Sequence, residues 1–272
     1  MSCRKMIPMQ AGLPETVTRR IAVVLGGRGS GQPLLDVLQP LLGEEAEFDL
    51  QGVFVEDAEL QQAAALPFVK EICRLTLSVR EFQSAQFERT VALRTRSARD
   101  AIAGLARRMG VPHSFRNVRG STVGLLRETA HSADITVFEP QPFFAATQVS
   151  LPAQKNRTQR RIVVAVNDLA TGTKALVAAR LLAKGEMRRI SILLSATTAA
   201  KQAALQRLIS DLLPAAPANV MLLSEPGVKH LIAAARAEDT AMLVLGTSEE
   251  LLKSESLRSL LQQLRCPVFL VR

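Results

Sequence analysis

One short pattern occurs twice in the chain, roughly half its length apart. RRIAVVL begins at Arg19 and RRIVVAV begins at Arg160. Each copy joins a basic pair to a run rich in β-branched residues, and each is followed by a turn and an amphipathic stretch. Self-similarity at domain-length spacing indicates repeated structural units. We therefore expect two related α/β units in tandem rather than a solenoid.

The second copy is followed by a regular alternation of strand-like and helix-like segments. This alternation predicts a doubly wound parallel sheet with right-handed crossovers. The expected strands are 162–166, 190–194, 220–223, 242–245 and 268–271, and the expected helices are 173–184, 198–213, 226–237 and 250–264.

The first copy is followed by the same alternation, with an interruption. A helical pattern fills residues 56–108, with a long helix at about 78–108 that ends before Gly110 and Pro112. We expect its apolar face to join the core or to cover the sheet edge left open in this half. That face comprises Leu75, Val79, Phe82, Phe87, Val91 and Leu93. The expected strands are 21–25, 48–55, 113–118 and 134–138, and the expected helices are 33–43 and 122–131.

These segments divide the chain into four parts. A length of 272 residues fits roughly two domains. Prolines and polar residues mark a linker between them. The predicted parts are a flexible tail at 1–18, a first unit at 19–140 that holds the helical insertion, a linker at 141–159 and a second unit at 160–272.

Composition excludes several classes of protein. With 47% hydrophobic and 22% charged residues, the chain is globular rather than disordered. Neither the three cysteines nor the three histidines have metal-ligand spacing, so we expect no zinc site. No secretory signal is recognised, and no window has the ~18 apolar residues that span a membrane. We predict a soluble cytoplasmic protein that does not contact a membrane.

The net charge of +9 raises the question of a nucleic-acid partner. Most arginines are scattered along helical segments with acidic residues nearby, and the densest cluster is 89–108. Charge alone is weak evidence. Aromatic residues, which stack single-stranded bases, make up only 4% of the chain. A basic nucleic-acid-binding module is thus an alternative that we favour less.

Several segments resemble the universal stress protein family. TAMLVLGTS (240–248) and LRCPVFLVR (264–272) are similar to the close of its domain, and RRIVVAVND (160–168) to its first strand. ADITVFEP (133–140) is similar to its fourth strand, and FVEDAELQQAAALPFVKEI (54–72) to a segment of tandem bacterial chains. The resemblance covers nearly all of the chain from the first repeat onward.

The resemblance implies a fold and a mode of assembly. It implies two adenine nucleotide alpha hydrolase-like sheets in tandem and a role in stress response. In this family the last strand commonly pairs subunits. We therefore expect Phe269 and its neighbours to form a homodimer or an interdomain contact.

The resemblance also implies a nucleotide site in the second unit. ATP-binding members carry Gly-x2-Gly-x9-Gly-(Ser/Thr) after the fourth strand, where glycines let backbone N–H groups approach phosphates. The first glycine matches Gly246, followed by Thr247 and Ser248. The family's aspartate after the first strand aligns with Asn167, next to Asp168. Equally, either residue could cap the following helix.

The rest of the glycine motif is not matched. Its second and third glycines fall on Glu249 and Ser259, and Glu250 and Glu255 add further acids. Carboxylates repel phosphates. We therefore expect degenerate or atypical binding, with ATP or another adenine nucleotide as the candidate ligand.

In the first unit, the turn GGRGSG follows the first strand. Gly27, Arg28 and Gly29 form either an anion cradle at the end of a strand or a flexible turn, which we favour. The segment 119–122, RGST, ends another strand and either adds to this cradle or caps a helix through Ser121 or Thr122.

No catalytic triad can be assembled from these residues. We therefore predict a non-catalytic, universal-stress-protein-like protein of the stress response. One alternative is an ATP-binding stress protein that hydrolyses ATP slowly, and the other is the basic nucleic-acid-binding module.

Overall fold

The computed structural model describes most of the chain between the first strand and the C-terminus. The segments expected to form a tail (1–18), a linker (141–159) and the Gly27–Arg28–Gly29 cradle lie outside the described residues. The described residues are 19–26, 32–42, 48–72, 76–138, 161–196, 198–223, 225 and 227–272.

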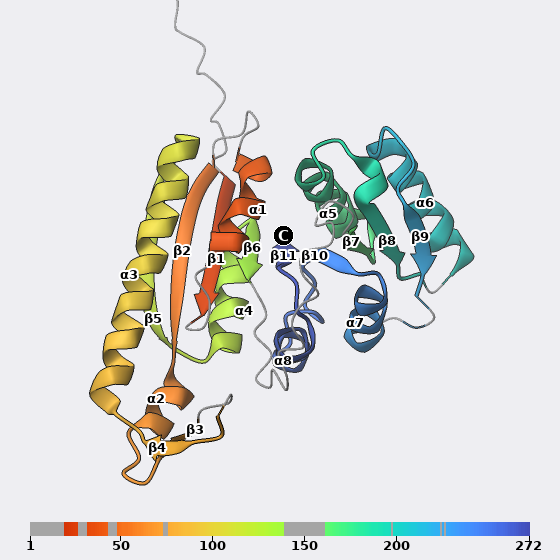
Figure 1. The fold of residues 1–272 in the computed structure, drawn as a ribbon. Coiled ribbons are helices and arrows are strands. Elements are labelled where there is room, and N and C mark those ends of the chain that lie inside the picture. The colour runs from red at the N-terminus through yellow and green to blue at the C-terminus, as the bar shows by residue number, and fades with distance from the viewer. Residues whose placement is uncertain are drawn as a thin grey trace, which may run out of the picture.

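Strands and helices alternate in both halves of the chain (Figure 1). The first half (residues 19–138) contains β1 Arg19–Gly26, α1 Gln32–Leu42, β2 Phe48–Asp57, α2 Ala58–Ala64, β3 Lys70–Ile72, β4 Val79–Glu81, α3 Ser84–Met109, β5 His113–Gly120, α4 Thr122–Ser132 and β6 Ile135–Phe138. The second half (residues 161–272) contains β7 Arg161–Val166, α5 Leu169–Leu182, the 3-10 helix η2 Met187–Arg189, β8 Ile190–Leu194, α6 Ala199–Leu212, β9 Asn219–Leu222, α7 Val228–Ala237, β10 Thr240–Gly246, α8 Ser254–Gln263 and β11 Val268–Val271.

Nine of these strands form one continuous sheet in the order β5-β2-β1-β6-β11-β10-β7-β8-β9. All neighbouring pairs are parallel except β6 and β11, which are antiparallel. The predicted α/β class with parallel strands is confirmed within each half. The two halves are not separate sheets, because β6 and β11 join them.

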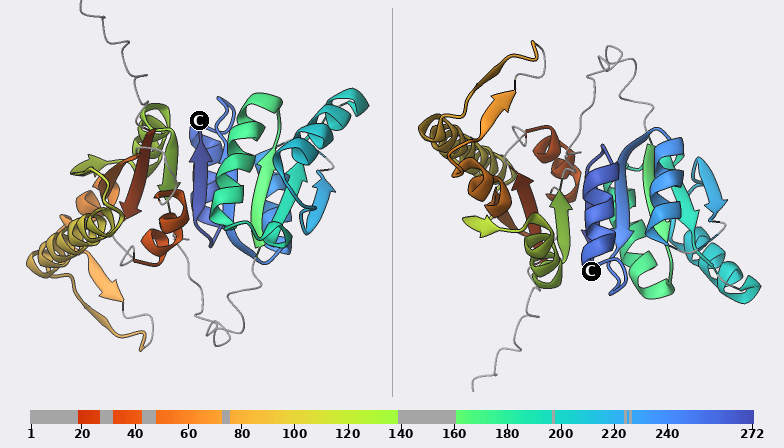
Figure 2. Two further views of the ribbon diagram at one scale, coloured as in Figure 1. Left: turned by 90° about the horizontal axis from the view of Figure 1, so that it is seen from above. Right: turned by 90° about the horizontal axis from the view of Figure 1, so that it is seen from below.

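Helices cover both faces of the sheet (Figure 2). One buried cluster packs α1, α3, α5 and α6 on one face, and a second packs α4, α7 and α8 on the other. Strands buried on both faces read as continuous apolar runs. In β1, the segment 21–25 is buried throughout, with Val23 in the first cluster and Val24 in the second.

The junction between the halves is fully buried. Phe138 lies opposite Val268, Ile135 lies opposite Val271, and every residue of β6 and β11 is buried. The sequence predicted an open edge in the first half, and the last strand of the second half covers that edge. Phe269 lies opposite Val137, so the last strand contacts the first half of the chain.

The same pairing bears on the expected homodimer. β11 pairs with β10 along one edge and with β6 along the other. It has no free edge for a second chain, so the last strand cannot form the expected intermolecular sheet. Association through another surface stays a prediction.

The insertion differs most from its prediction. Residues 56–108 are not helical throughout, because β3 and β4 form an antiparallel hairpin whose residues are all exposed. The expected apolar face is confirmed only in part: Val91 packs against the core, whereas Val79 and Leu93 are 58% and 68% exposed, and Leu75 lies outside the described residues. The buried residues of α3 are Thr95, Ala98, Ile102, Leu105 and Ala106.

Close packing of α3 on the sheet requires a glycine in β2. A β-carbon at Gly52 would lie 2.7 Å from Phe115 Cδ2 and 2.9 Å from Ile102 Cγ1. Both neighbours are within the packed core or against it. Any larger residue at this position would force α3 or β5 away from β2.

We expect Gly52→Ala to lower the free energy of unfolding by about 1–3 kcal/mol, because it overpacks the core. Urea denaturation followed by circular dichroism measures this. Gly104→Ala in α3 is the matched control, since its β-carbon meets nothing closer than 3.9 Å. The control should stabilise by up to about 1 kcal/mol through helix propensity. Equal effects of the two substitutions would contradict this account.

Candidate functional site

Asp168 caps the first helix of the second half. Its Oδ1 accepts a hydrogen bond from the backbone N–H of Thr171 at 2.9 Å, and its Oδ2 accepts one from Thr171 Oγ1 at 2.5 Å. α5 therefore begins at Leu169, earlier than the predicted 173. Asn167, one residue earlier, is exposed. Of the two roles considered for Asp168, the structure assigns helix capping.

The capping contacts keep Asp168 ionised. Partial burial raises its pKa, but hydrogen bonds from Thr171 and Ala170 and the charge of Lys201 outweigh burial, so the pKa lies below its usual range. A negative charge is thus already held at the N-terminus of α5. A phosphate at the same helix end would be repelled by it.

Gly246 serves close packing at the end of β10. A β-carbon there would lie 2.6 Å from Thr171 Oγ1 and 3.0 Å from the Thr171 carbonyl carbon. The first turn of α5 therefore rests directly on this glycine. Gly246 and Asp168 both lie against Thr171, which fills the space where a ligand would meet them.

The two hydroxyl residues after Gly246 are engaged within the chain. Thr247 donates from its backbone N–H and from Oγ1 to the carbonyl of Val271, at 2.7 and 3.2 Å. Ser248 Oγ accepts from the N–H of Leu251 at 3.3 Å. Leu251 and Leu252 are buried directly after the predicted phosphate-binding positions. These contacts leave the second half a poor phosphate site.

A cavity of about 360 Å³ lies at the equivalent end of the first-half strands, and α8 of the second half completes its wall. It lies where β1, β2 and β6 end and where α4 begins, which is where open α/β sheets bind ligands. The lining residues that matter for its chemistry are Gly26, Glu56, Asp57, Arg94, Ser121, Thr122, Phe138, Arg258 and Gln262.

The N-terminus of α4 opens on this cavity without a side-chain cap. Ser121 occupies the capping position, but its side chain makes no capping hydrogen bond. Arg94 from α3 and Arg258 from α8 line the same cavity. Backbone N–H groups at a helix start and guanidinium groups both favour anions. This arrangement is suited to a phosphate or carboxylate.

The acidic side of the cavity is occupied by internal hydrogen bonds. Asp57 accepts from the backbone N–H of Glu59 at 2.9 Å and of Leu60 at 3.3 Å, which caps α2. Glu56 accepts from Gln61 Nε2 at 2.9 Å and Asn117 Nδ2 at 2.5 Å. These carboxylates still have lone pairs that can accept hydroxyl or amino donors from a ligand.

Six of the nine cavity residues named above were missed by the sequence analysis: Glu56, Asp57, Phe138, Arg94, Arg258 and Gln262. Arg94, Arg258 and Gln262 lie on helices far apart in the sequence. They meet because β11 runs antiparallel to β6, so the end of α8 lies beside the end of β6. No local motif signals such a contact. By contrast, Ser121 and Thr122 were singled out from their place at the end of a strand.

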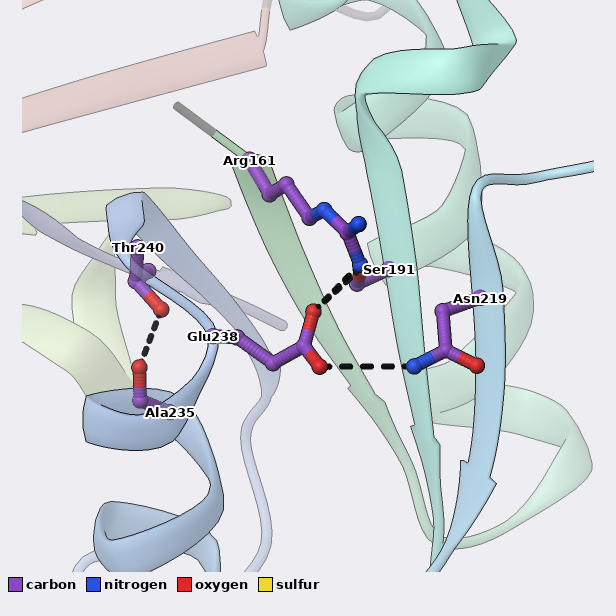
Figure 3. Close-up of polar contacts among 6 residues, drawn as sticks. All are labelled: Arg161, Ser191, Asn219, Ala235, Glu238 and Thr240. Atoms are coloured by element: carbon purple, nitrogen blue, oxygen red, sulfur yellow. Dashed lines mark hydrogen bonds and ion pairs between the residues drawn. The ribbon is translucent and has the colours of Figure 1, made fainter. Parts of the chain in front are cut away.

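A separate polar cluster lies at the amino ends of β7, β8 and β9 (Figure 3). Glu238 Oε2 accepts from Arg161 Nη1 at 2.7 Å and from Ser191 Oγ at 2.8 Å, and Oε1 accepts from Asn219 Nδ2 at 3.3 Å. Burial raises the pKa of Glu238, but these hydrogen bonds and the Arg161 charge outweigh it, so the pKa is lowered. The cluster joins three strands and the end of α7.

We expect Glu238 to stabilise the fold only where it is ionised. Because its pKa is lowered by folding, its contribution is full above the ordinary value of 4.5 and is lost as the pH falls through the folded value. Glu238→Gln should lower the free energy of unfolding by about 1–3 kcal/mol at neutral pH and have little effect in acid. The midpoints of urea denaturation of the wild type and the variant, measured at several pH values, test this. Glu249→Gln, on an exposed turn, is the control, and a constant difference across pH would contradict the assignment.

The chain is similar in structure to known proteins, but no known family or curated protein matches it in sequence. No protein-family model matches the chain. No curated protein matches it either. A universal stress protein from Archaeoglobus fulgidus DSM 4304 is similar in structure at 12% identity, TM-score 0.46, over 92% of this chain and 96% of that one.

Two further structures show comparable likeness. A functionally unknown protein from Pseudomonas aeruginosa PAO1 gives 12% identity and TM-score 0.49, over 94% and 93% of the two chains. The cytoplasmic domain of a prokaryotic cation chloride cotransporter gives 10% identity and TM-score 0.45, over 93% and 94%. At these values the likenesses do not define a function. The α/β class rests on the strand order itself.

Neither a membrane-spanning helix nor a metal-holding cluster occurs among the described residues. No helix among them is long and apolar enough to cross a membrane. Within the same ranges, no group of three or more histidine, cysteine, aspartate or glutamate side chains is placed to hold a metal ion.

Proposed function

We propose that this chain is a non-catalytic, universal-stress-protein-like protein of the stress response that binds an adenine nucleotide at an atypical site in its first half. The proposal combines the sequence resemblance with the anion-binding cavity beside α4. It includes two stress-protein-like units in tandem, with the boundaries predicted above, and a cytoplasmic location.

One contrast between two helix starts carries the proposal. At α5, the carboxylate of Asp168 already occupies the N-terminal N–H group that a phosphate would use. At α4, no side chain caps the N-terminus, and Arg94 and Arg258 line the cavity in front of it. The uncapped start of α4 and the two guanidinium groups support a phosphate at this end of the cavity, whose other lining includes the carboxylates of Glu56, Asp57 and Glu59.

The remaining features of the cavity agree with a nucleotide. A volume of about 360 Å³ lies within the range of small-molecule sites. Phe54, Leu126 and Phe138 supply apolar surface for a base, and Glu56 or Asp57 can accept from ribose hydroxyls.

We expect ATP to bind the full chain with micromolar affinity in calorimetry, and mass spectrometry of the denatured protein to release the same nucleotide. The double variant Arg94→Gln, Arg258→Gln should weaken binding at least about tenfold, because it removes both cations from the cavity. The double variant Asn167→Ala, Asp168→Ala is the matched control and should bind as the wild type does.

Two results would overturn this assignment. Loss of binding only in the Asn167, Asp168 double variant would show that the nucleotide binds in the second half. No binding and no released nucleotide would leave a protein that acts through partners. Circular dichroism of both double variants separates loss of binding from loss of folding.

A further inference from the structure

The insertion carries a hairpin that stands away from the main sheet. β3 and β4 lie at the N-terminal end of α3 and form a sheet of their own (Figures 1 and 2). No residue of β3 or β4 is buried, and none of α2, which precedes them, is buried either. A two-stranded hairpin without further packing is marginally stable in water. Neither the sequence resemblance nor the proposed nucleotide site gives this hairpin a role.

One face of the hairpin presents apolar side chains to solvent. Ile72 lies directly opposite Val79, and these side chains are 60% and 58% exposed. Phe68 and Leu77, which precede β3 and β4 by two residues, are each 75% exposed. Among the described residues, six of the ten exposed large apolar side chains lie between positions 60 and 79. Such a concentration marks an interaction surface, whereas scattered apolar side chains do not.

The opposite face of the hairpin is paired within the chain. Glu71 lies opposite Arg80, whose Nε and Nη2 donate to Glu71 Oε2 and Oε1 at 2.8 and 2.9 Å. Because successive residues of a strand point to opposite faces, this ion pair lies on the side away from Ile72 and Val79. The hairpin therefore has one internally paired face and one apolar face.

The apolar face also carries one cation and one anion. Lys70 lies opposite Glu81, and each is two residues from Ile72 or Val79, so the four side chains share this face. Within the described ranges, no ion pair joins Lys70 to Glu81. The face is thus neutral in a chain whose net charge is +9. A high net charge keeps copies of a chain apart, and a neutral face is where this repulsion is weakest.

We propose that this face binds the same face of a second copy of the chain, about a two-fold axis that runs along the hairpin. Such an axis places β3 of each copy across from β4 of the other. Ile72 then packs against Val79 of the second copy, and Lys70 lies across from Glu81 of the second copy. Each contact occurs twice, which is the self-complementarity that a two-fold interface requires.

The size of the face suits a weak, reversible dimer. Phe68, Ile72, Leu77 and Val79 together expose on the order of 500 Å² per copy, which is near the largest apolar patch of a typical monomer. Two such faces bury about 1,000 Å² in total, at the lower end for specific interfaces. The hairpins are therefore large enough to pair two copies reversibly and too small for an obligate dimer.

Sedimentation equilibrium of the full chain, from about 1 to 200 µM, tests the pairing. The wild type should show a monomer–dimer equilibrium with a dissociation constant below about 100 µM. Ile72→Ser with Val79→Ser should weaken it at least about tenfold, because the central apolar contacts are lost. Leu222→Ser is the matched control, since Leu222 is 51% exposed on the edge strand β9. A wild type that stays monomeric, or a control that dissociates as fully as the hairpin variant, overturns the proposal.

Charge reversal tests the axis itself. Lys70→Glu and Glu81→Lys each place like charges across the axis, so each variant alone should associate at least about tenfold more weakly. An equimolar mixture of the two variants should recover most of the wild-type association, because every carboxylate then lies across from an ammonium group. Damage confined to each hairpin is not repaired by mixing. A mixture that associates no better than the single variants shows that the proposed arrangement is wrong.

Discussion

The antiparallel pairing of β6 with β11 is the contact on which the rest of the molecule depends. Each half by itself would expose a row of unpaired backbone groups and an apolar strand, a liability that proteins cover or pair. Here the two edges cover one another, and all eight residues of the pair are buried. Because the strands run in opposite directions, the carboxyl ends of the first four strands face one end of the sheet and those of the last five face the other. Sites at the two ends cannot share a ligand.

The carboxyl ends of the strands are closed in the second half and open in the first, although the surrounding strands are arranged in the same way. At β7 and β10, a capping carboxylate, a glycine under the first helical turn and two buried leucines close the space. At β1 and β2, no side chain caps α4, and the space stays open to arginines from α3 and α8. The difference lies in a few side chains, because the strand order around both ends is the same.

Much of the fold could be predicted from the sequence, because buried parallel strands are short runs of β-branched residues and their positions are unambiguous. The strands expected at 162–166 and 190–194 lie within one residue of β7 and β8. The hairpin of β3 and β4 could not be predicted, since its exposed residues carry no periodic apolar signal. The joining of the halves and the contribution of Arg258 depend on contacts between distant segments, which local patterns do not encode. Gly246 was correctly placed at a strand end, but a glycine that admits a helix and a glycine that admits a phosphate look alike in sequence.

The cavity beside α4 is lined by residues of both halves, so a ligand bound in it would help to hold the two halves together. Arg94 belongs to the first half of the chain, whereas Arg258 and Gln262 belong to the second, so a molecule held there touches both sides of the β6–β11 seam. Any ligand that binds only the joined form stabilises it in proportion to the logarithm of its concentration. The proposed ligand would therefore add a contact across the seam to those already made by the pairing of β6 with β11 and by the packing of α1 on α5 and of α4 on α8.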